Sequence, residues 1–156
     1  MGDLFRVNVY TEKLAKVLNN PGKVRRWLTD RAGVVRLGIS QDETTEIQQI
    51  IYRSNEKSEW VTIETFAADG DEWMPLGFEG DNRTLYIRSN AGRSTAAIYT
   101  YDPEQRKITG TVFAHDTYDA GGIIYSRHLK KVIGVSYEAE KQRIEWLDPE
   151  RLGRGR

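Results

Sequence analysis

The sequence contains no cysteine, only two histidines and four prolines among its 156 residues. Without cysteine there is no disulfide, no thiolate metal site and no cysteine nucleophile, and two histidines argue against a histidine-rich metal site. Charge of one sign is also lacking, because 23 Lys and Arg residues balance 23 Asp and Glu residues. We therefore expect no metal ion, no cofactor and no nucleic-acid partner.

Long hydrophobic runs are absent as well. No stretch of 18 apolar residues occurs, and the first residues lack the basic, apolar and small-residue order of a signal peptide. We therefore expect no membrane partner, and a cytoplasmic or periplasmic location for a chain without a signal peptide. The basic segment 151–156 is typical of a disordered tail.

The sequence is rich in bulky residues that favour strands, with 8 Tyr, 4 Trp and 4 Phe. A chain of this length is about the size of one ordinary domain and can bury a core. These features predict one folded domain over residues 1–150.

A repeat of about 47 residues organises the chain. Alternating apolar segments recur at Phe5, Ile51, Ile98 and Ile144, in steps of 46, 47 and 46 residues. A second series, Leu14, Val61 and Ile108, has steps of 47 residues. A third series, Val35, Leu85 and Ile133, has steps of 50 and 48 residues. Because side chains alternate between the two faces of a strand, each segment predicts a half-buried strand.

Turn-forming residues follow the first series at the same offset. They read Asn-Glu-Lys at 55–57, Asp-Pro-Glu at 102–104 and Asp-Pro-Glu at 148–150. Proline presets φ for a turn, and Asn or Asp side chains accept hydrogen bonds from the backbone just beyond them. Each unit therefore contains a strand, a hairpin turn and a further strand.

Four short strands per unit of this length are typical of a β-propeller blade. The fold class predicted is all-β, a propeller fragment of about three and a half four-stranded antiparallel blades. The blades are expected at 4–18, 23–66, 72–113 and 121–148, with thirteen strands in total. Local helix propensity leaves two helices open as an alternative, over 11–20 and over 138–152.

Five short segments carry a resemblance to a known family: Leu4–Tyr10, Asn20–Val24, Trp27–Asp30, Gly33–Arg36 and Tyr99–Asp102. Together they resemble the N-terminal β-propeller of bacterial prolyl oligopeptidase family serine peptidases of the aminoacyl-peptidase and dipeptidyl-peptidase types. The resemblance implies a propeller lid over an α/β-hydrolase domain that carries the Ser, Asp and His triad. It also implies that the lid limits access to small or unfolded peptides.

The catalytic half of such an enzyme is not visible in this sequence. No Gly-x-Ser-x-Gly nucleophile elbow occurs, and the nearest approach, at 92–96, ends in alanine within a predicted hairpin. We therefore expect no catalytic residue in this chain. The resemblance implies a non-catalytic lid that gates and positions peptide substrates, with the peptidase catalytic domain of the parent chain as its partner.

Substrate contacts are expected near the propeller axis, where the first strand of each blade lies. The candidates are Arg25, Arg26, Asp69, Asp71, Glu72 and Arg127. The three carboxylates lack the EF-hand spacing, so they do not predict a calcium site.

Two other functions remain open at this point. A stand-alone interaction or carbohydrate-binding β module would expose Trp27, Trp60, Trp73 and Trp146 on one face, whereas a lid would bury them between blades. An autonomous hydrolase would need Ser94 and His115 within hydrogen-bond reach of each other. An incomplete propeller exposes strand edges, so we also expect a homo-oligomer, with one end blade completed by a neighbour's strand.

Overall fold

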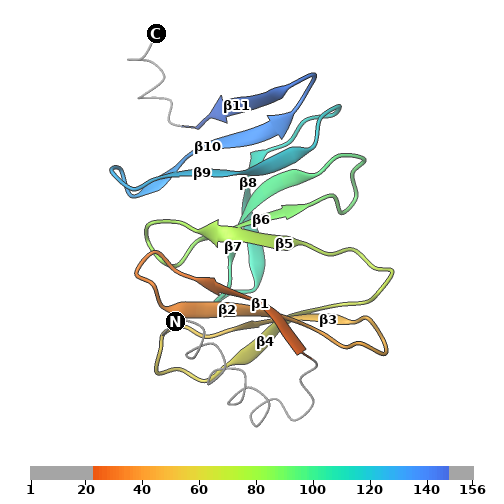
Figure 1. Cartoon of the computed structure of the whole chain (residues 1–156), viewed down its shortest axis with the longest axis vertical. Helices are drawn as coiled ribbons and strands as arrows, with labels where there is room; N and C mark the ends of the chain where they lie inside the picture. The colour runs from red at the N-terminus through yellow and green to blue at the C-terminus, as the bar shows by residue number, and fades with distance from the viewer. Residues whose placement is uncertain (1–22, 148–156) are drawn as a thin grey trace. The chain divides into compact units, whose positions relative to one another are not determined.

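The computed structural model describes residues 23–147, and all regular secondary structure within that range is β-strand (Figure 1). The strands are β1 (Lys23–Thr29), β2 (Val35–Gln41), β3 (Gln48–Tyr52), β4 (Val61–Phe66), β5 (Met74–Phe78), β6 (Leu85–Ser89), β7 (Ala97–Asp102), β8 (Lys107–Phe113), β9 (Ala120–Ser126), β10 (Lys131–Glu138) and β11 (Gln142–Trp146). The all-β prediction is confirmed.

The strands form three antiparallel sheets in which neighbours in the sequence are neighbours in space. Their orders are β1-β2-β3-β4, β5-β6-β7-β8 and β11-β10-β9. The chain divides into two compact units, and the first sheet belongs to unit 1, whose described residues are 23–29 and 33–70. Unit 2 comprises residues 30–32 and the rest of the described chain from 71 onward, with the other two sheets.

The same pattern of irregularity recurs in every sheet. The first and second strands are paired with register shifts, as between Pro75 and Gly77 of β5. The second and third strands are paired without any shift in all three sheets. Where a fourth strand is present, its pairing is again shifted. The three sheets are therefore copies of one unit, as the sequence period predicts.

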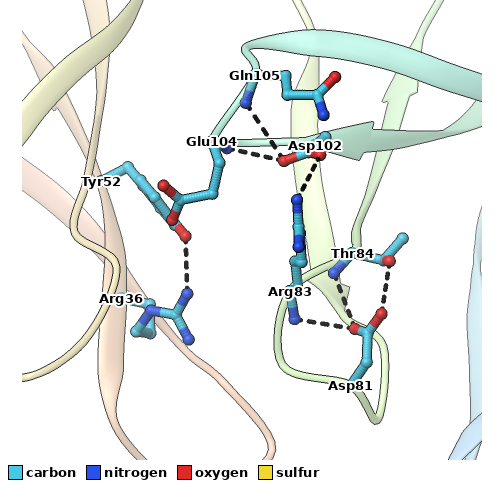
Figure 2. Close-up of polar contacts among 8 residues, drawn as sticks. All are labelled: Arg36, Tyr52, Asp81, Arg83, Thr84, Asp102, Glu104 and Gln105. Atoms are coloured by element: carbon cyan, nitrogen blue, oxygen red, sulfur yellow. Dashed lines mark hydrogen bonds and ion pairs between the residues drawn. The ribbon is translucent and has the colours of Figure 1, made fainter.

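The core of unit 1 combines apolar side chains with two buried arginines. Val35, Ile51 and Trp60 form its hydrophobic cluster, and Trp27 packs against it. The ring centroids of Trp27 and Trp60 are 5.4 Å apart. Two buried guanidinium groups are accommodated because they donate to backbone carbonyls at 2.8–2.9 Å, Arg36 to Arg53 O and Arg53 to Val35 O. Figure 2 shows the further bond from Arg36 to the Tyr52 hydroxyl.

The core of unit 2 is apolar and lies between its two sheets. Tyr86 and Ile98 of the β5–β8 sheet pack with Val132 and Val135 of the β9–β11 sheet, and β9 contacts β5, β6 and β7. Neither sheet could bury its inner face alone, so each supplies apolar surface to the other. This is the stacking expected of neighbouring repeat units.

A carboxylate links these two sheets by hydrogen bonds to β6 and β10. Both Glu79 oxygens accept hydrogen bonds, one from the Val132 N–H at 2.7 Å and the other from the Tyr86 hydroxyl at 2.7 Å. Burial of Tyr86, together with its hydrogen bond to Glu79 and the nearby negative charge, raises the pKa of the Tyr86 hydroxyl well above its ordinary value. The phenol therefore remains a donor through the neutral pH range.

The turns use the carboxylate and amide chemistry that the sequence predicts. Asp102 accepts from the Glu104 N–H at 2.9 Å, and Asn55 accepts from the Lys57 N–H at 2.8 Å at the equivalent place in unit 1. Asp81 accepts from the Thr84 N–H and hydroxyl, both at 2.8 Å (Figure 2). These bonds to the next few residues fix the hairpins locally. Asp102 also accepts from the Arg83 guanidinium at 3.4 Å (Figure 2).

Several expectations are refined by these observations. The possible helix over 138–152 is not found in its described part, because residues 142–146 form strand β11 and each of them pairs with a residue of β10. The first expected blade, at 4–18, and the second possible helix, at 11–20, lie outside the described residues, as does the tail at 151–156. The strand orders within residues 23–147 give three separate sheets, so the propeller assignment stays a prediction.

Candidate functional site

The residues predicted to contact substrate are dispersed. Arg25 and Arg26 are exposed on β1, and Asp69 is exposed after β4, all in unit 1. In unit 2, Asp71 and Glu72 are exposed before β5.

Arg127 is exposed in the turn that follows β9. Of the six candidates, only Glu72 borders the cavity described next.

A cavity of about 310 Å³ lies within unit 2, at the end of the sheet where β5 begins and β6 ends. Its walls come from four separate segments: the approach to β5, the end of β6, the residue before β7 and the residue before β9. The lining residues are Glu72, Trp73, Met74, Arg88, Ser89, Asn90, Ala96 and Asp119. The volume is sufficient for a small organic ligand or one or two amino-acid residues.

Arg88 supplies the positive charge of this cavity. It lies on β6, is half-buried, and one guanidinium nitrogen donates to the carbonyl oxygens of Gly121 at 3.2 Å and Ala120 at 3.4 Å. These bonds hold the guanidinium against the start of β9. Its other nitrogens make no hydrogen bond to residues 23–147 and can receive an anion, for which the planar guanidinium fork is well suited.

Two carboxylates provide the opposite charge. The Asp119 carboxylate lines the cavity and accepts a hydrogen bond from the Ala96 N–H at 2.7 Å. Glu72 also lines the cavity, and its backbone carbonyl accepts from the Ser89 hydroxyl at 2.8 Å. Charges of both signs therefore line one small cavity.

An apolar wall completes the cavity. The half-buried Trp73 ring packs on the buried Tyr101 ring, with centroids 4.8 Å apart. Met74, 45% exposed, stands opposite Arg88 in the β5–β6 ladder. A ligand could place an apolar group against the indole and the thioether while its charged ends meet Arg88 and the carboxylates.

The four tryptophans do not form one exposed aromatic surface. Trp60 is buried, Trp27 and Trp73 are half-buried, and only Trp146 is exposed, at 41%. They are not all buried either. The exposure of the tryptophans therefore does not distinguish a propeller lid from a stand-alone binding module. Trp73 is the one that borders the cavity.

The possible base, His115, makes its contacts with residues other than Ser94. His115 Nδ1 accepts hydrogen bonds from the backbone N–H groups of Thr117 at 2.9 Å and Tyr118 at 3.2 Å. The His115 ring is stacked in an aromatic cluster with Phe113 and Tyr137. Ser94 is exposed, and within residues 23–147 no hydrogen bond joins it to His115.

No group of three or more metal-binding side chains occurs in the part of the chain that the structure describes. No helix able to cross a bilayer is found there either.

Sequence reasoning missed Arg88 because the residue sits in an alternating strand, where an arginine ordinarily points to solvent. The missing signal is its environment, which is created by a β9 carbonyl pair more than thirty residues away in the sequence. Comparison with known proteins adds no assignment, since no family model, no curated protein and no solved structure matches this chain.

Proposed function

We propose that this chain is a recognition module, built from repeated antiparallel sheets, that binds a short zwitterionic peptide in the cavity beside Arg88. The observation that carries the proposal is the half-buried guanidinium with unused donors, facing a cavity that also contains Glu72 and Asp119. A peptide with free ends carries a carboxylate and an ammonium group, which match these charges. The Trp73 ring offers a surface for an apolar side chain.

The energetics favour a ligand whose charges are both matched. A half-buried arginine forms charge-assisted hydrogen bonds worth about 1.5–3 kcal/mol each to a carboxylate. The exposed carboxylates contribute less because water screens them, so Arg88 is expected to dominate affinity and Asp119 to contribute to selectivity.

The resemblance to prolyl oligopeptidase family peptidases gives this binding a place in a larger reaction. In that arrangement the module would gate and position peptides for a serine peptidase domain on a longer parent chain. The binding step does not depend on that domain and can be measured on this chain alone.

Isothermal titration with an unblocked tripeptide tests the proposal. We expect binding that weakens at least about tenfold in Arg88→Ala, since the lost bond energy exceeds about 1.4 kcal/mol. Acetylation and amidation of the peptide should have a comparable effect. Arg127→Ala is the matched control, because it removes an exposed arginine at the far end of β9 and should leave the affinity unchanged.

Thermal melting separates a binding effect from a folding effect, because Arg88 also supports β9. Arg88→Lys retains a charge but not the planar fork, and should fold while binding more weakly than the parent. Equal affinity for blocked and unblocked peptides, or an unaffected Arg88→Ala variant, would refute the proposal. Binding of an uncharged oligosaccharide in place of the peptide would favour the carbohydrate-binding alternative.

A further inference from the structure

The third strand of each sheet occupies the same structural position, yet β11 has a different environment from β3 and β7. In the first two sheets a fourth strand covers the third, β4 on β3 and β8 on β7. Within the described residues β11 has β10 on one side only and forms the outer edge of its sheet (Figure 1). All five of its residues are exposed, including Ile144 at 46%.

The other outer edges carry features that discourage further pairing. β4 and β8 are each paired with register shifts, and β8 contains Gly110 in its middle. Bulges twist an edge away from a regular ladder and so protect it from association. The β10–β11 pairing has no such shift, so β11 presents a regular edge.

The alternation of hydrogen bonds along the β10–β11 ladder shows which backbone N–H and C=O groups of β11 point away from β10. The Leu147 N–H donates to Ile133 O at 2.8 Å, just beyond the strand. Because bonded and non-bonded pairs alternate along an antiparallel ladder, Glu145 and Arg143 also bond to β10. Ile144 therefore directs its backbone N–H and C=O toward the open side, as do Gln142 and Trp146.

The sequence of this edge is complementary to itself. If two copies of β11 pair antiparallel with Ile144 opposite Ile144, Arg143 of each copy stands opposite Glu145 of the other. The outward-facing N–H and C=O groups of the two Ile144 residues can then exchange two hydrogen bonds. Opposite charges directly across a ladder are stabilising, and like charges are destabilising.

The neighbouring registers lack this complementarity. Two other pairings also keep the N–H and C=O groups of residues 142, 144 and 146 facing the partner strand. In one, the two-fold axis passes through Arg143, and Arg143 stands opposite Arg143. In the other, it passes through Glu145, and Glu145 stands opposite Glu145. The charges therefore select the register centred on Ile144 over both alternatives.

Pairing of two β11 strands would also bury apolar side chains of this edge. Ile144 and Trp146 lie over Gly134 of β10, where a Cβ would stand 3.1 Å from the Trp146 ring and 3.4 Å from Ile144. The absence of a side chain at Gly134 lets both pack on the sheet, and they stay partly exposed on the same face. Pairing would bring the two Ile144 side chains into contact and extend this apolar strip across the two copies.

We infer that β11 is the docking edge for β11 of a second copy of this chain, in an antiparallel two-fold pair centred on Ile144. The contact is closed, because it consumes the open edge of both copies and leaves none for a third. It gives the homo-oligomer expected from the sequence a specific interface, and it does not depend on peptide binding.

Charge reversal tests the register. Sedimentation of the full 156-residue chain over a concentration series should show a monomer–dimer equilibrium. Arg143→Glu alone and Glu145→Arg alone should each weaken dimerisation by about tenfold or more, because each places like charges opposite one another twice. An equimolar mixture of the two variants, and the double variant with the charges exchanged, should restore it.

Lys107→Glu is the matched control, since it reverses an exposed charge on β8, another edge strand of unit 2. It should leave the dimerisation constant unchanged, and circular dichroism should show that all variants keep their β content. A parent chain that is monomeric at all concentrations overturns the inference. That outcome is expected if a strand from segment 4–18 of the same chain pairs with β11. The inference is also overturned if the single charge reversals leave the dimerisation constant unchanged, or if the mixture of the two variants does not dimerise as the parent does.

Discussion

Strands β7 and β11 are the same element of the repeat in two environments. Each pairs with the preceding strand over five residues without a register shift, yet Ile98 of β7 is fully buried while Ile144, 46 residues later, is 46% exposed. The residue type is the same, and both residues lie in the third strand of their sheet at the spacing of the repeat. Burial here is therefore set by the neighbours, namely β8 and the β9–β11 sheet in one case and, within the described residues, an open edge in the other.

The largest expected effect comes from truncating these two isoleucines. Ile98→Ala should lower the free energy of unfolding by about 2–5 kcal/mol, because it leaves a cavity in the core of unit 2. Ile144→Ala should remain within about 0.5 kcal/mol of the parent at monomer concentrations, since water already reaches the side chain. Urea denaturation of both variants checks this, and equal losses would contradict the comparison.

A smaller contrast is expected at two glycines in second strands. An added Cβ at Gly38 would meet Trp27 at 2.9 Å and Ile51 at 3.1 Å, and Ile51 is fully buried. Gly38→Ala should therefore destabilise the chain by about 1–3 kcal/mol through overpacking. At Gly134 the neighbouring side chains, Ile144 and Trp146, are exposed and can move, so Gly134→Ala should cost less.

Thermal melts of the two glycine variants, measured side by side, test this order. A Gly134→Ala variant at least as unstable as Gly38→Ala would mean that the β11 edge is as tightly held as a core strand.

The smallest effect concerns Glu79, which joins Val132 of β10 to Tyr86 of β6. Tyr86→Phe removes one hydrogen bond and should cost about 0.5–1.5 kcal/mol at pH 7. The folded-state pKa of Tyr86 lies above its unfolded value near 10, so the stabilisation is fully present below that pH. It is lost as the pH rises through the folded-state pKa.

Denaturation of the parent and of Tyr86→Phe from pH 8 to pH 11 measures this linkage. The gap in stability between them should narrow above about pH 10. Tyr99→Phe is the control for the loss of a tyrosine hydroxyl, because Tyr99 lies on the neighbouring strand β7. If the difference in free energy of unfolding between the parent and Tyr86→Phe increased with pH, the account would be contradicted.

The fold was accessible from the sequence because its signals are local and repeated. The turns at Asn55 and Asp102 act through their own following residues, and the alternation around Ile51 and Ile98 reports the strand directly. The segment 138–147 shows the limit, since its helix-favouring residues form β11 where β10 offers a ladder. Tertiary pairing there overrides local propensity.

The candidate site was less accessible because its parts meet only in space. Glu72 was identified as a possible contact, but Arg88 and Asp119 come to the cavity from strands and loops distant in the sequence. A local pattern reports whether a residue is on a strand. It does not report which carbonyls, such as that of Gly121, receive its side chain.

Amide hydrogen exchange most directly tests the claim that β11 is a third strand without a fourth. In the dilute monomer, the amides of Arg143 and Glu145 should be protected by β10, while the Ile144 amide exchanges rapidly toward the open side. The Ile98 amide of β7, between two strands, should be strongly protected. An Ile144 amide as slow as that of Ile98 under these conditions would contradict the account.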